Sequence, residues 1–197
     1  MSQCTLCPRR VSTRPHCPWR TYDEPVSDVL SCPGCGFIWD DVAVRDVPGR
    51  LERATSAFVD VLATAGELAP IRPELDRWSI VEYAAHLRDV HLTLRERVIL
   101  ATILDDAVGT PIFRDERVNA GFYASDTANT VAHELQVTSQ LLLRAVATLS
   151  PEQLAREFTY SPASPMRVTV LWAAAQGVHE SEHHLADARD NLARLAP

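Results

Sequence analysis

Four stretches of this chain repeat apolar residues at the spacing of an α-helix, and this periodicity limits the fold more than any other feature. They cover residues 51–65, 79–98, 127–149 and 169–195. Each stretch has one apolar side, which it can bury only against another element of the same kind. The sequence therefore predicts an all-α protein built around a four-helix bundle.

Local signals between these stretches refine the prediction. Ser79 and Glu82 have the spacing of a capping box at the start of the second helix, which gives Glu82 a structural role, although it could also orient a site residue. The sequence Ser150-Pro151 predicts a short additional helical turn. The connection 105–126 is long, so the topology need not be a simple up-and-down bundle. Short extended pieces are expected within 158–170 and, as a small hairpin, within 31–41.

The first 45 residues differ in composition from the remainder of the chain. They hold all five cysteines and many prolines, and they lack helical periodicity. The dipeptide Pro48-Gly49 punctuates the chain just after them. We therefore expect a Cys-rich zinc-binding module at 1–45 and a helix bundle at 46–197.

Charge and hydropathy exclude several classes of function. Residues 1–45 carry five arginines and five acidic residues, and residues 46–197 carry 14 arginines and 21 acidic residues, so the body has a net charge of −7. An acidic body argues against broad binding of nucleic acid or anionic membranes. The chain has no lysine, which excludes Schiff-base chemistry. It has neither a long apolar run nor a secretory signal, so we expect a cytoplasmic protein without membrane contact.

The cysteines form two Cys-x-x-Cys pairs separated by 24 residues. Clustered cysteines in a reducing compartment indicate metal binding rather than disulfides. The predicted ligands of this structural zinc are Cys4, Cys7, Cys32 and Cys35. Cys17 and His16 lie between the pairs and could substitute, and free thiols in a loose tail are the alternative. The spacing is similar to that of a zinc ribbon, a class that often binds nucleic acid or protein.

Residues 179–184 read "HESEHH" within the fourth helical stretch. His179 and His183 are four residues apart, so they share one helical face and can bind one transition-metal ion. A solvated charged face is the alternative, and His184 with Glu180 could be a surface pair.

A third ligand would have to come from the second helix, which offers His86 and His91. Spacing alone does not choose between them. His91 lies on the apolar stripe and fits a hydrogen-bonded core residue, whereas His133 of the third helix lies off the apolar side and is expected at the surface.

The stretch "WSIVEYAAHLRDVH" resembles the second helix of the DinB-like (damage-inducible) bundle family, and "VHESEHHLAD" resembles its fourth helix. Members combine a Trp-Ser-x-x-Glu-x-x-x-His-Leu stretch with a later His-x-x-x-His pair. The matching residues here are Trp78, Ser79, Glu82, His86, Leu87, His179 and His183. The similarity extends over about residues 50–195. It implies a bundle metal site formed by His86, His179 and His183.

The resemblance also implies a function. Three neutral imidazoles leave the charge of a divalent ion uncompensated, whether zinc, nickel or iron. Such an ion can bind a thiol as thiolate, or lower the pKa of a bound water to about 7. Relatives that use mycothiol or bacillithiol imply a thiol S-transferase or thiol-dependent isomerase acting on a small electrophile, in a possible homodimer. A metal-dependent hydrolase, and a non-catalytic binding protein that uses the zinc module, are the alternatives. Arginine is the natural clamp for a carboxylate, and Arg88, Arg114 and Arg117 are candidates.

Overall fold

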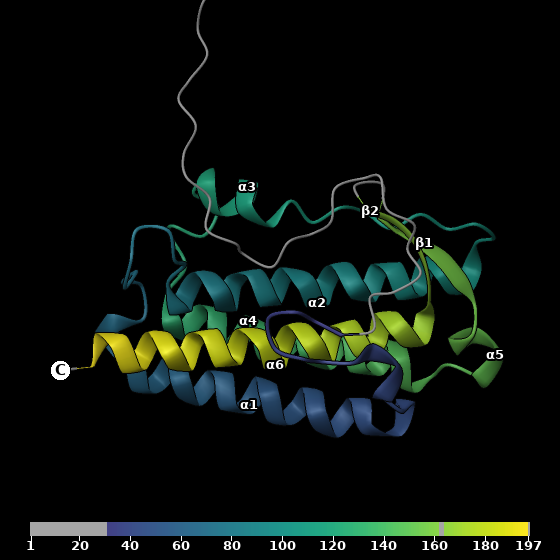
Figure 1. Cartoon of the computed structure of the whole chain (residues 1–197), viewed down its shortest axis with the longest axis horizontal. Helices are drawn as coiled ribbons and strands as arrows, with labels where there is room; N and C mark the ends of the chain where they lie inside the picture. Colours follow the sequence, from purple (N-terminus) through teal and green to yellow (C-terminus); the bar gives the residue numbers. More distant parts are fainter. Residues whose placement is uncertain (1–30, 162–163, 197) are drawn as a thin grey trace, which may run out of the picture.

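The computed structural model describes residues 31–161 and 164–196, and four long helices dominate this part (Figure 1). They are α1 (Val47–Ala65), α2 (Ile80–Ile103), α4 (Ala128–Ala147) and α6 (Val170–Leu195). Helix α2 packs against α4 and α6, and α1 packs against the same two helices from the other side. This arrangement confirms the predicted four-helix bundle.

The order in which the helices are connected departs from an up-and-down bundle. Helices α2 and α4 run in the same direction, and both end near α5 (Pro151–Leu154) (Figure 1). The chain must therefore return along the bundle between them, and residues 104–127, with α3 (Arg114–Asn119), make this return. The expectation drawn from the long connection is confirmed.

Capping residues define where the helices begin. The hydroxyl of Ser79 accepts a hydrogen bond from the Glu82 N–H at 3.1 Å, and the Glu82 carboxylate accepts one from the Ser79 N–H at 2.8 Å. Glu82 also pairs with Arg72 at 2.8 Å, so its contacts are those of a helix cap. Ser150 and Gln153 form the same capping box at α5. Both predicted helix starts are confirmed.

The shorter elements include one confirmed and one corrected expectation. Strands β1 (Glu157–Ser161) and β2 (Ser164–Thr169) form an antiparallel pair, as the extended piece at 158–170 suggested. The hairpin expected at 31–41 does not form. Residues 33–35 make a turn that is closed by a 2.7 Å bond from the Gly36 N–H to the Cys32 carbonyl. The chain then continues through the 3₁₀ turns η1 (Trp39–Asp41) and η2 (Val44–Asp46), and η3 (Gly66–Leu68) follows α1.

The core of the bundle is divided by a polar layer. One apolar cluster surrounds Leu94 and Phe158, and a second surrounds Phe58 and Leu135. Between them every long helix contributes buried polar side chains, and Thr55 of α1 donates to the Ser139 hydroxyl of α4 at 3.1 Å. Buried polar groups cost free energy unless they find partners, so this layer marks the place to look for a site. Of the helices in residues 31–161 and 164–196, none is both long and apolar enough to span a membrane.

Candidate metal centre

Three buried side chains of the polar layer converge between α2 and α6. They are His86, Glu180 and His184, which expose only 2%, 8% and 6% of their surface. The Nε2 atoms of His86 and His184 lie 3.6 and 3.3 Å from Oε2 of Glu180. All three donor atoms lie within 4.8 Å of one another. Because Glu180 and His184 are one helical turn apart, α6 presents both toward His86.

Neighbouring groups orient two of these side chains, Glu180 and His184. Nδ1 of His184 lies 2.9 Å from the Asp187 carboxylate, which leaves Nε2 to face Glu180. The side-chain amide of Gln176 donates to Oε1 of Glu180 at 2.6 Å, and the Trp39 indole N–H donates to Gln176 at 2.6 Å. Ligands of protein-bound metals are oriented by such carboxylate and amide partners. Glu180 and His184 therefore have such supporting contacts, whereas the buried Nδ1 of His86 has no hydrogen-bond partner among the described residues.

The electrostatics of the trio keep Glu180 ionised beside a positively charged His184. Burial opposes the charged form of Glu180, but hydrogen bonds with His184 and His86 outweigh it and hold its pKa well below the usual range. Burial likewise lowers the pKa of His184, but its bonds with Asp187 and Glu180 raise that pKa to about 9. Burial lowers the pKa of His86. Glu180 and His184 are thus a buried pair, and the surface pair considered from the sequence is wrong.

Two cavities flank the trio. His86 and Glu180 line a cavity of about 260 Å³ whose other walls are largely apolar. His184 lines a larger cavity of about 590 Å³, together with polar side chains such as Glu74, Arg77 and Asn119. Both volumes are in the range of small-molecule sites or just below it. The trio is therefore accessible from two sides.

The smaller cavity contains a buried arginine. Arg97 exposes 3% of its surface, stacks on Tyr160 at 4.0 Å from the ring centroid and donates from Nη2 to the Thr110 carbonyl at 2.5 Å. Its Nε has no hydrogen-bond partner among the described residues. The backbone of Gly109 packs tightly beside it, since a Cβ on Gly109 would lie 2.3 Å from the Tyr160 carbonyl oxygen and 2.8 Å from Nε of Arg97. Arg97 brings a positive charge to the wall of this largely apolar cavity, which favours an anionic ligand there.

The sequence model of the DinB superfamily matches residues 50–188, which is more than half of the chain. The chain belongs to the DinB superfamily. The trio and the lining of the smaller cavity lie within the matched residues, whereas Trp39 and Gly34, which lines part of the larger cavity, lie before them.

Solved structures share the DinB fold at low sequence identity. YfiT from Bacillus subtilis, described as a probable metal-dependent hydrolase with an unusual four-helix bundle topology, has a TM-score of 0.61 and 20% identity over 77% of this chain and 83% of that one. The mycothiol-dependent maleylpyruvate isomerase has a TM-score of 0.62 and 15% identity over 76% of this chain and 62% of that one. A histidine-to-alanine mutant of that isomerase has a TM-score of 0.62 and 14% identity, again over 76% of this chain and 62% of that one. No curated protein matches the chain.

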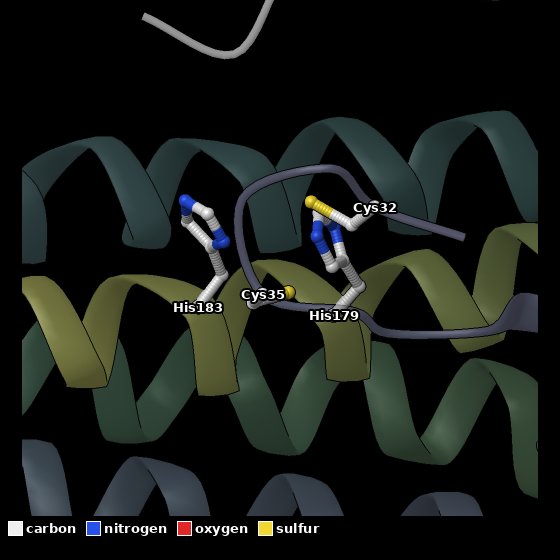
Figure 2. A group of neighbouring side chains, drawn as sticks. All are labelled: Cys32, Cys35, His179 and His183. Atoms are coloured by element: carbon white, nitrogen blue, oxygen red, sulfur yellow. The ribbon is translucent and has the colours of Figure 1, made fainter.

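The DinB bundle separates the histidines that the sequence analysis grouped. His179 and His183 lie with Cys32 and Cys35, and their donor atoms are within 4.8 Å of one another (Figure 2). Within the described residues, His86 shares its group with Glu180 and His184 instead. The ligand set inferred from the family resemblance is thus divided between two neighbouring groups.

The other candidates from the sequence have clear positions. His91 is a core residue whose Nε2 lies 3.0 Å from the Ser181 hydroxyl, and His133 is exposed, as predicted. Arg88 pairs with Asp126 and Glu134, and Arg117 pairs with Asp89, whereas Arg114 lines both cavities. The remaining predicted ligands and their substitutes lie outside the described residues: Cys4, Cys7, His16 and Cys17.

Sequence reasoning missed Glu180 and Arg97 as site residues. The signal for Glu180 was present, because Glu180 and His184 have the same four-residue spacing as His179 and His183. Arg97 gave no such signal, because the cavity that it lines with residues 111–113 and Tyr160 forms only in the folded chain.

Proposed function

We propose that this protein is a metal-dependent enzyme that joins a low-molecular-weight thiol to a small carboxylate-bearing electrophile, or uses the thiol to isomerise it. The observation that carries the proposal is the position of His86, Glu180 and His184, which lie between two cavities of different polarity. The fold similarity to a mycothiol-dependent isomerase supports the same class of reaction.

The donor set fits a divalent transition metal. Two imidazole nitrogens and one carboxylate oxygen are a ligand set of catalytic zinc, and iron or nickel also accept these donors. Three protein ligands leave coordination positions open, and the bound ion would stabilise a thiolate at neutral pH. The buried Glu180 carboxylate supplies the negative charge that partly compensates the ion.

The two cavities favour a reaction with two substrates. The larger one offers Glu74, Arg77 and Asn119 to the hydroxyl and amide groups of a sugar-linked thiol. The smaller one is mostly apolar and contains Arg97, whose planar donors match a carboxylate. A hydrolase would need only water as its second reactant. The second cavity therefore favours thiol chemistry over hydrolysis, the reaction class named for YfiT.

The test is turnover of zinc-loaded protein with mycothiol and two probes, maleylpyruvate and chlorodinitrobenzene. We expect thiol-dependent turnover in the wild type, and its loss in His86→Ala and Glu180→Gln. His133→Ala, an exposed histidine of α4, is the matched control and should retain activity. Turnover that is independent of the thiol would support the hydrolase instead. Activity that survives both site variants would refute the proposed site.

A further inference from the structure

We propose a second metal site, in which Cys32, Cys35, His179 and His183 bind one zinc ion and fasten residues 31–46 to helix α6. Figure 2 shows the loop that carries the two cysteines lying over the helix that carries the two histidines. Two sulfur and two nitrogen donors are a ligand set of closed, structural zinc sites.

The cysteine loop has the backbone of a metal-binding knuckle. It is closed by 2.7 Å hydrogen bonds from the Gly36 N–H to the Cys32 carbonyl and from the Cys32 N–H to the Phe37 carbonyl. Gly36 has φ +74°, a conformation that side chains disfavour. A Cβ on Gly34 would lie 3.1 Å from the His183 ring, so glycine allows the loop to approach the helix.

The two histidines present buried ring nitrogens that make no hydrogen bond within the described part of the chain. His179 exposes 6% of its surface, and neither ring nitrogen has a hydrogen-bond partner among the described residues. Nδ1 of His183 is in the same situation. Buried polar groups without a partner oppose folding. A cation coordinated by these nitrogens and by the buried Cys32 sulfur would remove that cost.

Surrounding groups hold the ligands in place. The rings of Phe37 and Trp39 contact the His179 ring at centroid distances of 5.1 and 4.9 Å. Nε2 of His183 lies 3.7 Å from the Asp187 carboxylate, which leaves its Nδ1 for the metal. Two thiolates also neutralise a divalent cation, so the complex can be buried without a net charge.

This site shares no proposed ligand with the His86 trio, although the Asp187 carboxylate lies next to both His183 and His184. Its histidines are offset by one residue from Glu180 and His184 along α6. It also excludes the four-cysteine site. Cys32 and Cys35 can bind zinc either with the two histidines or with Cys4 and Cys7, but not with both pairs. The two arrangements differ in the number of sulfur ligands that each chain supplies.

X-ray absorption at the zinc edge of the unmutated full-length protein, combined with its zinc content, tests the proposal without relying on any variant. We expect two sulfur ligands per chain at about 2.3 Å, with nitrogen ligands at about 2.0–2.1 Å. Four sulfur ligands per chain would overturn the proposal in favour of the four-cysteine site. Zinc bound by nitrogen and oxygen alone, or a Cys32–Cys35 disulfide in zinc-loaded protein, would overturn it as well.

Variants then assign the ligands. Cys32→Ser combined with Cys35→Ser should lose one zinc ion per chain, and so should His179→Ala combined with His183→Ala. Cys4→Ser combined with Cys7→Ser is the matched control and should keep the full zinc content. His86→Ala should lose the other ion only, so failure of one site is distinguishable from failure of the other. Zinc loss in the control pair would contradict the proposal.

Discussion

Replacing Gln176 with leucine tests whether the segment before the bundle supports the proposed catalytic metal. Gln176 is 1% exposed and connects two side chains. It accepts a 2.6 Å hydrogen bond from the Trp39 indole and donates one of 2.6 Å to Glu180. Leucine fills a similar volume but can do neither. The change therefore leaves the indole N–H and Oε1 of Glu180 buried without these partners.

The magnitude follows from these two contacts. Each buried group left unsatisfied costs about 1–3 kcal/mol, so the free energy of unfolding should fall by roughly 2–6 kcal/mol. Loss of the partner that orients a metal ligand weakens metal binding by about 10–100-fold. Trp39→Phe removes only the indole N–H and keeps a ring stacked on Trp172, so we expect a weaker effect of about tenfold or less.

The assay measures how much zinc each chain binds in chelator-buffered zinc solutions. The affinity of interest is that of the ion that His86→Ala does not bind. Urea unfolding of the same proteins gives the change in stability. Gln140→Leu, the same change at an exposed position of α4, is the matched control and should leave both measurements unchanged. Wild-type zinc affinity in Gln176→Leu would refute the reasoning, because Glu180 would then be positioned without Gln176.

Three further predictions concern other parts of the molecule. Arg97→Lys should raise the KM for a carboxylate substrate about tenfold or more in steady-state kinetics, because a lost charge-assisted hydrogen bond costs about 1.5–3 kcal/mol. The KM for an uncharged analogue should not change. Gly109→Ala should destabilise the protein by about 1–3 kcal/mol in thermal unfolding, since the new Cβ would meet the Tyr160 carbonyl. Gly49→Ala in α1 is the control and should be neutral or stabilising. Ser79→Ala should cost about 1 kcal/mol in denaturant unfolding through loss of the α2 cap.

The architecture could be predicted because its determinants are local. Helical periodicity and the caps at Ser79 and Ser150 are short-range signals, and the observed helices follow them. The course of residues 31–46 could not be predicted in this way. This segment has little periodicity of its own, and its structure depends on contacts with α6, such as the bond from Trp39 to Gln176.

The sequence places candidate ligands on α2 and α6, the two helices that carry the trio, but it does not choose one face of α6. An α-helix turns by about 100° per residue, so the pair His179/His183 and the pair Glu180/His184 project in directions that differ by roughly that angle. Both pairs have the spacing of metal ligands. Only the rotation of α6, which is set by the packing of residues such as Val178 and Leu185, brings Glu180 and His184 toward His86.

The same rotation explains why a second site is needed to account for the burial of His179. Val178, Ser181 and Leu185 mark the core side of α6, and His179 lies roughly 160° away from Ser181 around the helix axis. A residue on that side would face solvent in a bare bundle, yet His179 is buried because Phe37 and Trp39 cover it. Neither nitrogen of this covered histidine has a hydrogen-bond partner in residues 31–161 and 164–196, which opposes docking of the segment unless something binds those nitrogens. A zinc ion bound by His179 together with Cys32 and Cys35 makes the free-energy contribution of His179 to docking favourable. Residues 31–46 then dock on α6 and hold Trp39 against Gln176.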